Sequence, residues 1–477
     1  MSYALRARPI DEGRRESEVS IMKKPYLREF GGEDPKTYPL SEIRYRGDGG
    51  RTLEVVNNLA MMDGKASRRL KLLFDKRAGS WQTLDRSGVW RYREFLPAFK
   101  PFDTVVSLAE GNTPLYALPR CARYSGMKEL FAKHQGLNPT GSFKDNGMTT
   151  AVSMAKKLGS RIVACASTGN TSASMAAYAA RAGMKSIVFI PHGQIAFGKL
   201  SQSLDYGALT IQIDGDFDRA MDIVQEVCDR GGIYLLNSIN PFRIEGQKTI
   251  MIEMLHQLGW QAPDWVVVPG GNLGNSSSFG KAFSELKHCG FIERVPKLAV
   301  IQAEGANPFY TSFSSKSATL ASVHANTRAT AIKIGNPVSF DKAMFAVNFT
   351  GGIVEQVSEG EIAVAKSVIG IDGVGSEPAS ATTVAGCKKL VQRGVIRPGD
   401  SVVCILTGHL LKDPDYTVEF HGDELYLDVK RTSAVTGTVR IPTEGMDNKP
   451  VQMPAHTRTI LDYIDKKCLE TPEGRMP

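Results

Sequence analysis

The stretch Gly136-Leu-Asn-Pro-Thr-Gly-Ser-Phe-Lys-Asp145 decides the fold, because it leads directly into a helical repeat. A P-loop has Lys directly after Gly and Ser or Thr after Lys; here Lys144 follows Gly-Ser-Phe, so the Walker phosphate cradle is absent. Ser142 and Asp145 have the spacing of a capping box. Apolar residues then recur at helical spacing, at Met148, Ala151, Val152, Ala155 and Leu158. The pattern predicts a helix over 145–158 with Lys144 at its N-terminus, where the dipole favours the neutral amine that a nucleophilic lysine needs. Taken alone, such a lysine is more often an exposed surface residue.

Buried strands are predicted after this helix in the chain. Short apolar runs alternate with helical patterns such as 172–182, and this alternation implies an α/β fold with parallel sheets and right-handed crossovers. The runs are Arg161–Cys165, Ser186–Ile190, Trp265–Val268, Leu298–Ile301 and Ser401–Leu406.

Two of these strands end in clusters suited to anions. Ala166–Ser174 opens an Ala-rich helix, and hydroxyls and N–H groups at a helix N-terminus can seat a carboxylate or a phosphate. Plain helix capping would use the same residues. Pro269–Ser276 has glycines that let backbone amides close on a phosphate, but it lacks GxGxxG spacing. This cluster indicates a monophosphate cup, with a simple tight turn as the alternative.

Two further segments could complete a site. Asn237–Thr249 offers Arg243 and Lys248 as cationic donors, with Asn237 and Ser238 as neutral ones. Arg is the natural bidentate partner of a phosphate, although this segment taken alone slightly favours Arg243 and Glu245 as ordinary surface charges. Thr407, after a buried strand, could place its hydroxyl against a ring nitrogen, whereas a lone His409 is more often structural. Pyridoxal phosphate needs most of this combined set.

Composition limits the class of protein. The net charge of +8 is spread along the chain, which disfavours nucleic acid as a partner and agrees with a small anionic substrate. No apolar run reaches about 18 residues, so no membrane span is expected. Seven cysteines lie far apart without a CxxC pair, which favours free thiols in a reducing compartment and no metal site. The Arg-rich N-terminus contains acids and no apolar core, so we expect a cytoplasmic protein.

Several segments together resemble the threonine synthases, in the order found in that family. They are Glu110–Leu115, Asn138–Asp145, Ser167–Ser174, Asn237–Thr249 and Gly270–Asn275. Tyr38–Tyr45, Ser87–Trp90 and Ile334–Ser339 are similar to the longer, plant-type branch. The resemblance covers about residues 38–421. One departure is Leu410 after Thr407-Gly-His, where that family often has Gly.

The resemblance implies the cofactor pyridoxal 5'-phosphate and a role for each matching residue. Lys144 matches the Schiff-base lysine, Asn170 the residue bonding the ring 3′-oxygen, and Thr407 the hydroxyl facing the pyridine nitrogen. The cofactor phosphate loop is matched by Gly270, Gly271, Asn272, Leu273, Gly274 and Asn275. The substrate residues matched are Ser167, Thr168 and Thr171 for the carboxylate, and Asn237, Ser238, Arg243 and Lys248 for the phosphate.

The implied reaction is the conversion of O-phospho-L-homoserine and water to L-threonine and phosphate, by γ-elimination and then β-addition. The alternative is another pyridoxal phosphate lyase of the same fold, such as a threonine or serine dehydratase, which would not need the second cationic seat. The resemblance also implies a homodimer. S-adenosylmethionine, the effector of plant enzymes, has no short motif that transfers to this chain.

The fold implied is the fold-type-II, tryptophan-synthase-β-like α/β architecture of two parallel-sheet domains, with an N-terminal extension and a C-terminal appendage. We expect a mobile or swapped arm over 1–36, a small N-terminal domain over 37–105, a large cofactor-binding domain over 106–150 and 236–427, a small α/β domain over 151–235, and the appendage over 428–477.

Overall fold

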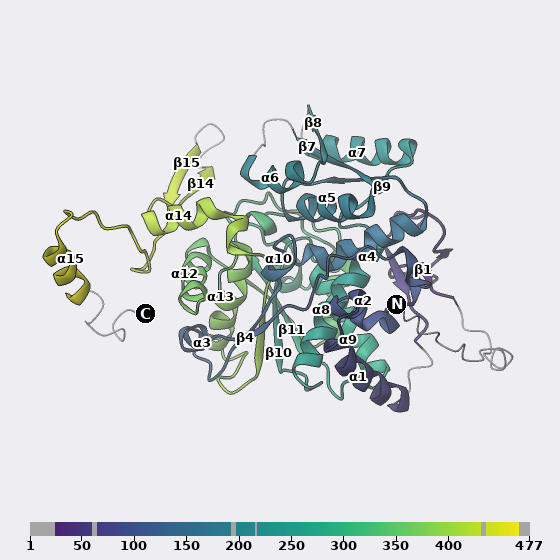
Figure 1. The fold of residues 1–477 in the computed structure, drawn as a ribbon, viewed down its shortest axis with the longest axis horizontal. Helices are drawn as coiled ribbons and strands as arrows, with labels where there is room; N and C mark the ends of the chain where they lie inside the picture. Colours follow the sequence, from purple (N-terminus) through teal and green to yellow (C-terminus); the bar gives the residue numbers. More distant parts are fainter. Residues whose placement is uncertain (1–23, 60–63, 192–196, 215–216, 431–435, 467–477) are drawn as a thin grey trace, which may run out of the picture.

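The structure is a computed structural model that describes residues 24–59, 64–191, 197–214, 217–430 and 436–466 (Figure 1). Its two larger sheets lie one above the other, with α4 (Lys144–Lys157) between them (Figure 1). None of the helices in these ranges is long and apolar enough to cross a membrane.

The larger sheet has six strands in the order β12-β11-β10-β13-β5-β4. All pairings are parallel except that of the edge strand β4. The strands are β4 (Leu115–Ala117), β5 (Phe131–His134), β10 (Trp265–Pro269), β11 (Lys297–Ala303), β12 (Ile353–Val357) and β13 (Val402–Leu406). The predicted strands that fall in this sheet are confirmed.

Helices cover both faces of this sheet because alternate strand residues are apolar on both sides. Val267 and Cys404 pack in the core cluster of α3 (Pro119–Ser125), α12 (Glu359–Ile371) and α13 (Pro378–Gln392). Val266 and Val403 pack in the cluster of α8 (Pro241–Gln257), α9 (Gly274–His288) and α11 (Phe340–Phe349). The sheet is therefore buried on both faces, as its continuous apolar runs require.

The smaller sheet is parallel, with the order β8-β7-β6-β9. It consists of β6 (Ile162–Ala166), β7 (Lys185–Pro191), β8 (Leu209–Ile213) and β9 (Tyr234–Leu235). The connecting helices are α5 (Asn170–Ala182), α6 (Phe197–Asp205) and α7 (Phe217–Gly231). Val163 and Cys165 of β6 pack against Met175 and Ala176 of α5, which fixes the helix beneath the sheet.

The N-terminal region begins with a small antiparallel sheet of β1 (Tyr26–Glu29), β2 (Thr37–Pro39) and β3 (Leu53–Val56), with β1 in the centre. Residues 1–36 were predicted to be an arm. That prediction is wrong for Tyr26–Glu29, because backbone pairing on both sides and the buried side chain of Leu27 hold this strand in the fold. Residues 1–23 lie outside the described ranges.

Short helices lead from this sheet to the catalytic part of the chain. They are α1 (Gly64–Ala78), α2 (Thr83–Arg86), η1 (Trp90–Phe95), η2 (Pro97–Phe99) and η3 (Phe102–Thr104). Trp90 is fully buried, and its indole Nε1 donates to Thr149 Oγ1 of α4 at 2.8 Å. The N-terminal region therefore supports the helix that begins at Lys144.

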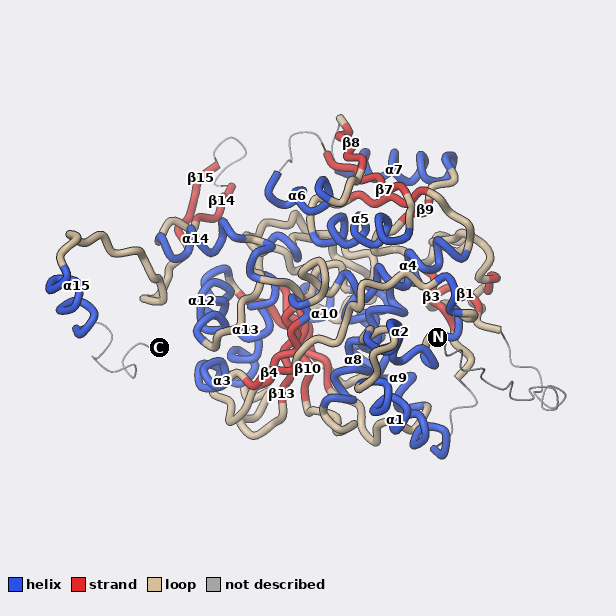
Figure 2. The backbone as a smooth tube through the Cα atoms, in the orientation of Figure 1, coloured by secondary structure: helices blue, strands red, loops and turns tan. Residues whose placement is uncertain are grey.

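The C-terminal elements extend away from the sheets (Figure 2). The hairpin of β14 (Tyr426–Lys430) and β15 (Thr436–Arg440) is antiparallel, and α15 (Thr457–Ile464) lies farther out. The remaining elements are α10 (Pro308–Ser314), α14 (Pro414–Gly422), η4 (Gln135–Leu137), η5 (Thr330–Ile332) and η6 (Leu410–Lys412).

Candidate active site

The site is formed where the parallel strands end. β10, β13 and β5 are neighbours in the large sheet, and β6 ends in the small sheet, so the loops that follow them converge. The helices α4 and α8 cross at very close range: a Cβ on Gly246 of α8 would lie only 1.8 Å from the carbonyl oxygen of Asn146 in α4. This crossing brings Lys144 and Arg243, near the starts of the two helices, into one site.

Lys144 begins α4, as predicted, but not through a capping box. The residue before the helix is Phe143, whose side chain makes no cap bond, and Ser142 Oγ accepts only a long hydrogen bond from the Lys144 amide, at 3.4 Å. Ser142 pairs with Gly408 in a bridge, and the amide of Phe143 donates to the carbonyl of Thr407 at 2.9 Å. These bonds place the Lys144 loop beside the end of β13.

Asp145 holds this loop against the small sheet instead of capping its own helix. Its Oδ1 accepts from Thr140 Oγ1 and Ser174 Oγ, both at 2.6 Å, and its Oδ2 accepts from the Thr140 amide at 2.7 Å. Burial raises the pKa of Asp145 to about 6, against the lowering effect of these donors. The predicted capping box is wrong, because Thr140 and Ser174 take up the carboxylate.

The amine of Lys144 is set up to be neutral. Burial and the positive charge of Arg243 lower its pKa to about 7, while Glu377 acts in the opposite direction. An amine that is half deprotonated near neutral pH can act as a nucleophile and as a proton carrier.

Glu377 was not found by sequence reasoning. It is 3% exposed, and it receives Asn170 Nδ2 on Oε2 at 2.9 Å and Thr407 Oγ1 on Oε1 at 2.8 Å. Burial raises its pKa. The carboxyl thus joins two residues that the sequence assigned separately. The available signal was weak: an acid directly before Pro378, the first residue of an apolar helix.

The glycine loop after β10 is a preformed cup. Gly270 has no room for a side chain, since a Cβ would lie 2.8 Å from Gln302 Cγ and 2.9 Å from Val300 Cγ1. Leu273 adopts a left-handed conformation, and no side chain caps the start of α9 that follows it. Asn275 Oδ1 and Ser276 Oγ are buried without a hydrogen-bond partner. Free helix amides and orphaned polar atoms at one point fit a phosphate group.

Ser238 and Asn272 connect this cup to the predicted substrate segment. Asn272 Nδ2 donates to Ser238 Oγ at 2.8 Å, and Asn272 Oδ1 accepts from the Val338 amide at 2.8 Å. The Asn237 side chain pairs with the backbone of Ala166 on both of its polar atoms, at 2.9 and 3.2 Å. Asn237 therefore fixes the strand end from which Ser167, Thr168 and Thr171 follow.

The two cations of the Asn237–Thr249 segment have different roles. Arg243 is 2% exposed, its Nη1 donates to the Leu236 carbonyl at 3.1 Å, and its Nε is unpartnered. No carboxylate pairs with Arg243 within the described ranges. Burial lowers the pKa of its guanidinium to about 10. A buried guanidinium of this kind fits an anionic ligand.

Lys248, by contrast, is not brought to the site. It is fully buried, and its Nζ lies 2.8 Å from Glu245 and 2.7 Å from Glu285 in a cluster with Lys281. The prediction that Lys248 binds the substrate phosphate is therefore corrected, because two carboxylates already hold the amine away from Arg243.

His409 and Leu410 also turn away from the site. His409 Nδ1 accepts from the Leu411 amide at 3.1 Å and caps η6, so its role is structural. The Leu410 side chain lies against Gly375 and lines a different cavity. The departure at Leu410 therefore does not narrow the wall beside Thr407.

These features define a class of protein, and comparison with known sequences agrees. Residues 106–408 match the family described as pyridoxal-phosphate dependent enzymes, and the chain belongs to that family. Within it, the chain belongs to the threonine synthases. It is 47% identical over 385 residues to a threonine synthase of Methanocaldococcus jannaschii, an alignment covering 80% of this chain and 92% of that protein.

Two further comparisons are consistent with this placement. The chain is 39% identical over 398 residues to threonine synthase 2, chloroplastic, of Arabidopsis thaliana, covering 82% of this chain and 77% of that protein. Among solved structures, threonine deaminase isoform 2 of Solanum lycopersicum superposes with a TM-score of 0.57 at 19% identity, over 69% of this chain and 92% of that one. This structural likeness supports the predicted fold type alone.

The residues present fit pyridoxal phosphate. The cup at Gly270–Asn275 leaves orphaned polar atoms and free helix amides for a phosphate, and the amine of Lys144 has a pKa near neutrality. Asn170 and Thr407 converge on Glu377, and these side chains supply polar atoms for a heteroaromatic ring.

Proposed function

We propose that this protein converts O-phospho-L-homoserine and water to L-threonine and inorganic phosphate. The observation that supports it most strongly is Arg243, a buried guanidinium with an unpartnered Nε close enough to Lys144 to lower the pKa of that amine. A dehydratase acting on serine or threonine has no second phosphate to bind. A cation held in a dry site beside the amine suits a substrate that carries its own phosphate.

The proposed assignments combine the resemblance to the threonine synthases with the contacts described above. The cofactor is held by Lys144, Asn170, Gly270, Gly271, Asn272, Leu273, Gly274, Asn275 and Thr407. The substrate carboxylate is bound by Ser167, Thr168 and Thr171, and the substrate phosphate by Arg243 and Ser238, with Asn237 positioning the loop. Lys248 is no longer included.

Pyridoxal phosphate, when bound, supplies a conjugated ring that accepts the electrons left when the substrate loses its α-proton. The neutral amine of Lys144 takes that proton and then removes one from Cβ, whose electron pair allows phosphate to leave from Cγ. Protons return to Cγ and, at the end, to Cα. Arg243 stabilises the phosphate as negative charge develops on it and it leaves from Cγ. The hydroxyls of 167–171, at the N-terminus of α5, hold the carboxylate and so orient the carbon chain. Water then adds at Cβ, which balances the reaction.

The deciding experiment incubates the cofactor-loaded protein with O-phospho-L-homoserine and measures free phosphate and threonine in the same sample. Equal amounts of both products are expected. Phosphate without threonine would indicate a γ-elimination lyase, and neither product would contradict the substrate. Lys144→Ala should abolish turnover and the absorbance of the bound cofactor, and full activity in that variant would refute the role of the lysine. A parallel sample with S-adenosylmethionine tests that compound as an effector.

We further propose a cytoplasmic homodimer whose ligands are small molecules rather than nucleic acid. The six cysteines within the described ranges are buried and unpaired, which agrees with a reducing compartment. The proposed domain division places the two sheets in separate α/β units, 106–150 with 236–427 and 151–235. Light scattering of the purified protein gives the assembly directly, and a monomer would contradict the dimer.

A further inference from the structure

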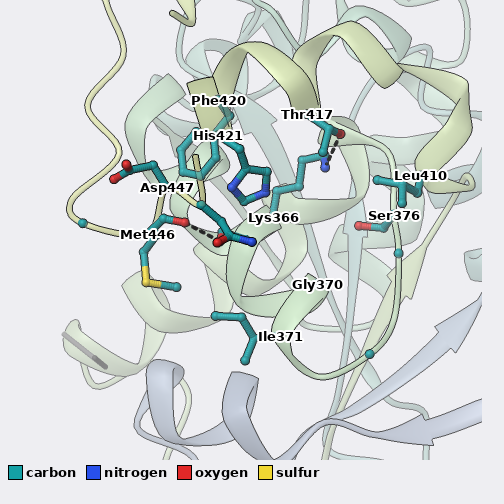
Figure 3. A pocket seen from close by; sticks show the side chains of 15 residues that line it. Lys366, Gly370, Ile371, Ser376, Leu410, Thr417, Phe420, His421, Met446 and Asp447 are labelled. Carbon is teal, nitrogen blue, oxygen red and sulfur yellow. Dashed lines mark hydrogen bonds between the residues drawn. The ribbon is translucent and has the colours of Figure 1, made fainter. Parts of the chain in front are cut away.

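A second cavity lies outside the active site, between α12, α14 and the segment Gly445–Asn448. Its volume is about 540 Å³. Figure 3 shows the Lys366 side chain running between His421 and Thr417, with Met446 and Asp447 on one side and Ser376 and Leu410 on the other. None of these residues takes part in the proposed reaction.

Two residues that line this cavity each carry a buried polar atom without a hydrogen-bond partner. Ser376 Oγ is buried and unpartnered in a residue only 2% exposed, and His421 Nδ1 is buried and unpartnered as well. Buried polar atoms in proteins are nearly always hydrogen-bonded, because a buried polar atom without a hydrogen bond costs free energy. Two such atoms in residues that line one cavity are compatible with a polar ligand there.

The cavity also presents one charge of each sign. Lys366 is 9% exposed, its Nζ donates to the hydroxyl of Thr417 at 2.8 Å, and it forms no ion pair within the described ranges. Burial lowers its pKa to about 8, so the amine is still mostly charged at neutral pH. Asp447, held by Thr443 at 3.0 Å, contributes the negative charge. Both charges lie near His421: burial and Lys366 lower the pKa of its ring, and Asp447 raises it.

The apolar part of the wall comes from Ile371, Leu410, Phe420 and Met446. A ligand that satisfies all these features carries a carboxylate for Lys366 and Ser376, an ammonium for Asp447 and His421, and an apolar arm. We propose that this cavity binds a free α-amino acid with an apolar side chain. Binding there would change the position of Glu377 in the active site through its neighbour Ser376.

The connection between the two sites is one peptide unit long. Ser376 lines the cavity and pairs with His409 in a bridge, while its neighbour Glu377 receives the side chains of Asn170 and Thr407. The amide of Glu377 also donates to the carbonyl of Gly408 at 3.0 Å. A ligand that draws Ser376 Oγ toward its carboxylate therefore acts on the carboxyl that positions two cofactor residues.

The test is calorimetric titration of the cofactor-loaded protein with each of alanine, valine, leucine, isoleucine, methionine and phenylalanine in the L form. At least one is expected to bind at a single site. Lys366→Met, which keeps the length of the side chain, and Asp447→Asn, at a half-buried position, should each weaken binding roughly tenfold or more, since each removes a charged partner. Lys128→Met, at an exposed position, is the matched control and should leave binding unchanged.

Analogues of the amino acid that binds test the two charges separately. Its deaminated acid and its decarboxylated amine should both lose binding, and saturation with the amino acid itself should shift the cofactor absorbance in the wild type but not in Lys366→Met. Binding that persists in both Lys366→Met and Asp447→Asn would place the ligand in the active site and overturn the proposal. Absence of binding by all six amino acids would overturn it too. The heat signal needs no turnover, so this outcome is independent of the proposed reaction.

Discussion

At the residue scale, Glu377 is the group whose removal should be most informative. Its two carboxylate oxygens accept from Asn170 and Thr407, so Glu377→Gln keeps the shape but turns one acceptor into a donor facing another donor. We expect kcat to fall roughly 10- to 100-fold, by analogy with the loss of outer-shell partners around other cofactor sites. Steady-state kinetics on O-phospho-L-homoserine, with the exposed Glu129→Gln as control, would measure it. Because the substrate seat is untouched, KM should change little; activity equal to that of the control would show that Glu377 only fills space.

The lysine offers a prediction in pH. Burial and Arg243 lower the pKa of Lys144 to about 7, whereas an ordinary lysine titrates near pH ~10.4. The neutral amine is the form that captures a carbonyl compound, so the rate of pyridoxal phosphate uptake by the cofactor-free protein should rise through neutral pH and level off above it. Arg243→Gln removes a nearby positive charge, stabilises the ammonium form and should move the midpoint to higher pH. Rapid-mixing absorbance across neutral pH measures both, and a midpoint unaffected by Arg243→Gln would contradict the electrostatic coupling.

At the element scale, α8 separates catalysis from stability along one helix. Lys248 and Glu245 belong to a buried ion cluster that joins α8 to α9 and reaches β3, where Lys281 donates to the carbonyl of Val55. Lys248→Met leaves two carboxylates, Glu245 and Glu285, to share Lys281 as their only cation in the cluster. We expect a loss of about 3–5 kcal/mol in the free energy of unfolding, with KM close to wild type. Arg243→Gln should do the reverse and raise KM with little loss of stability. Denaturant unfolding and kinetics on both variants would separate the two roles. A raised KM in Lys248→Met would show that Lys248 does bind the substrate.

The crossing of α4 and α8 should tolerate no side chain at Gly246. A Cβ there would lie 1.8 Å from the carbonyl oxygen of Asn146, so Gly246→Ala must push the helices apart. Overpacking of this kind costs about 1–3 kcal/mol, and it would also separate Lys144 from Arg243. Both stability and kcat should therefore fall together in thermal unfolding and kinetic assays. Gly422→Ala is the control, since no atom lies within 4 Å of its added Cβ, and an equal effect at both positions would argue against the close crossing.

The same elements show what the sequence could and could not predict. Strands such as Trp265–Pro269 were predicted because an apolar run followed by glycines is a local signal. The capping box at Ser142 failed because Asp145 is held by Ser174, a partner brought close only by the tertiary fold. Glu377 was missed for the same reason, since Asn170 is 207 residues away in the chain. Lys248 could have been excluded from sequence alone: five residues after Arg243 on a helix, it points roughly 140° away.

At the scale of the whole molecule, the cofactor should connect the two sheets. Its proposed contacts come from the large sheet through Lys144, Thr407 and the glycine loop, and from the small sheet through Asn170 at the start of α5. Without the cofactor, the hydrogen bonds described at the site between the two sheet regions include Asn170–Glu377 at 2.9 Å and Ser174–Asp145 at 2.6 Å. Binding that favours the native state adds about 2.7 kcal/mol when free ligand is 100 times its Kd, so removing pyridoxal phosphate should lower Tm by several degrees. Hydrogen exchange should rise most in α5 and its flanking loop and least in β11, which is buried and paired on both sides in the large sheet. A uniform rise in exchange, or an unchanged Tm, would mean that the two sheets hold together without the cofactor, and that its contribution is confined to chemistry.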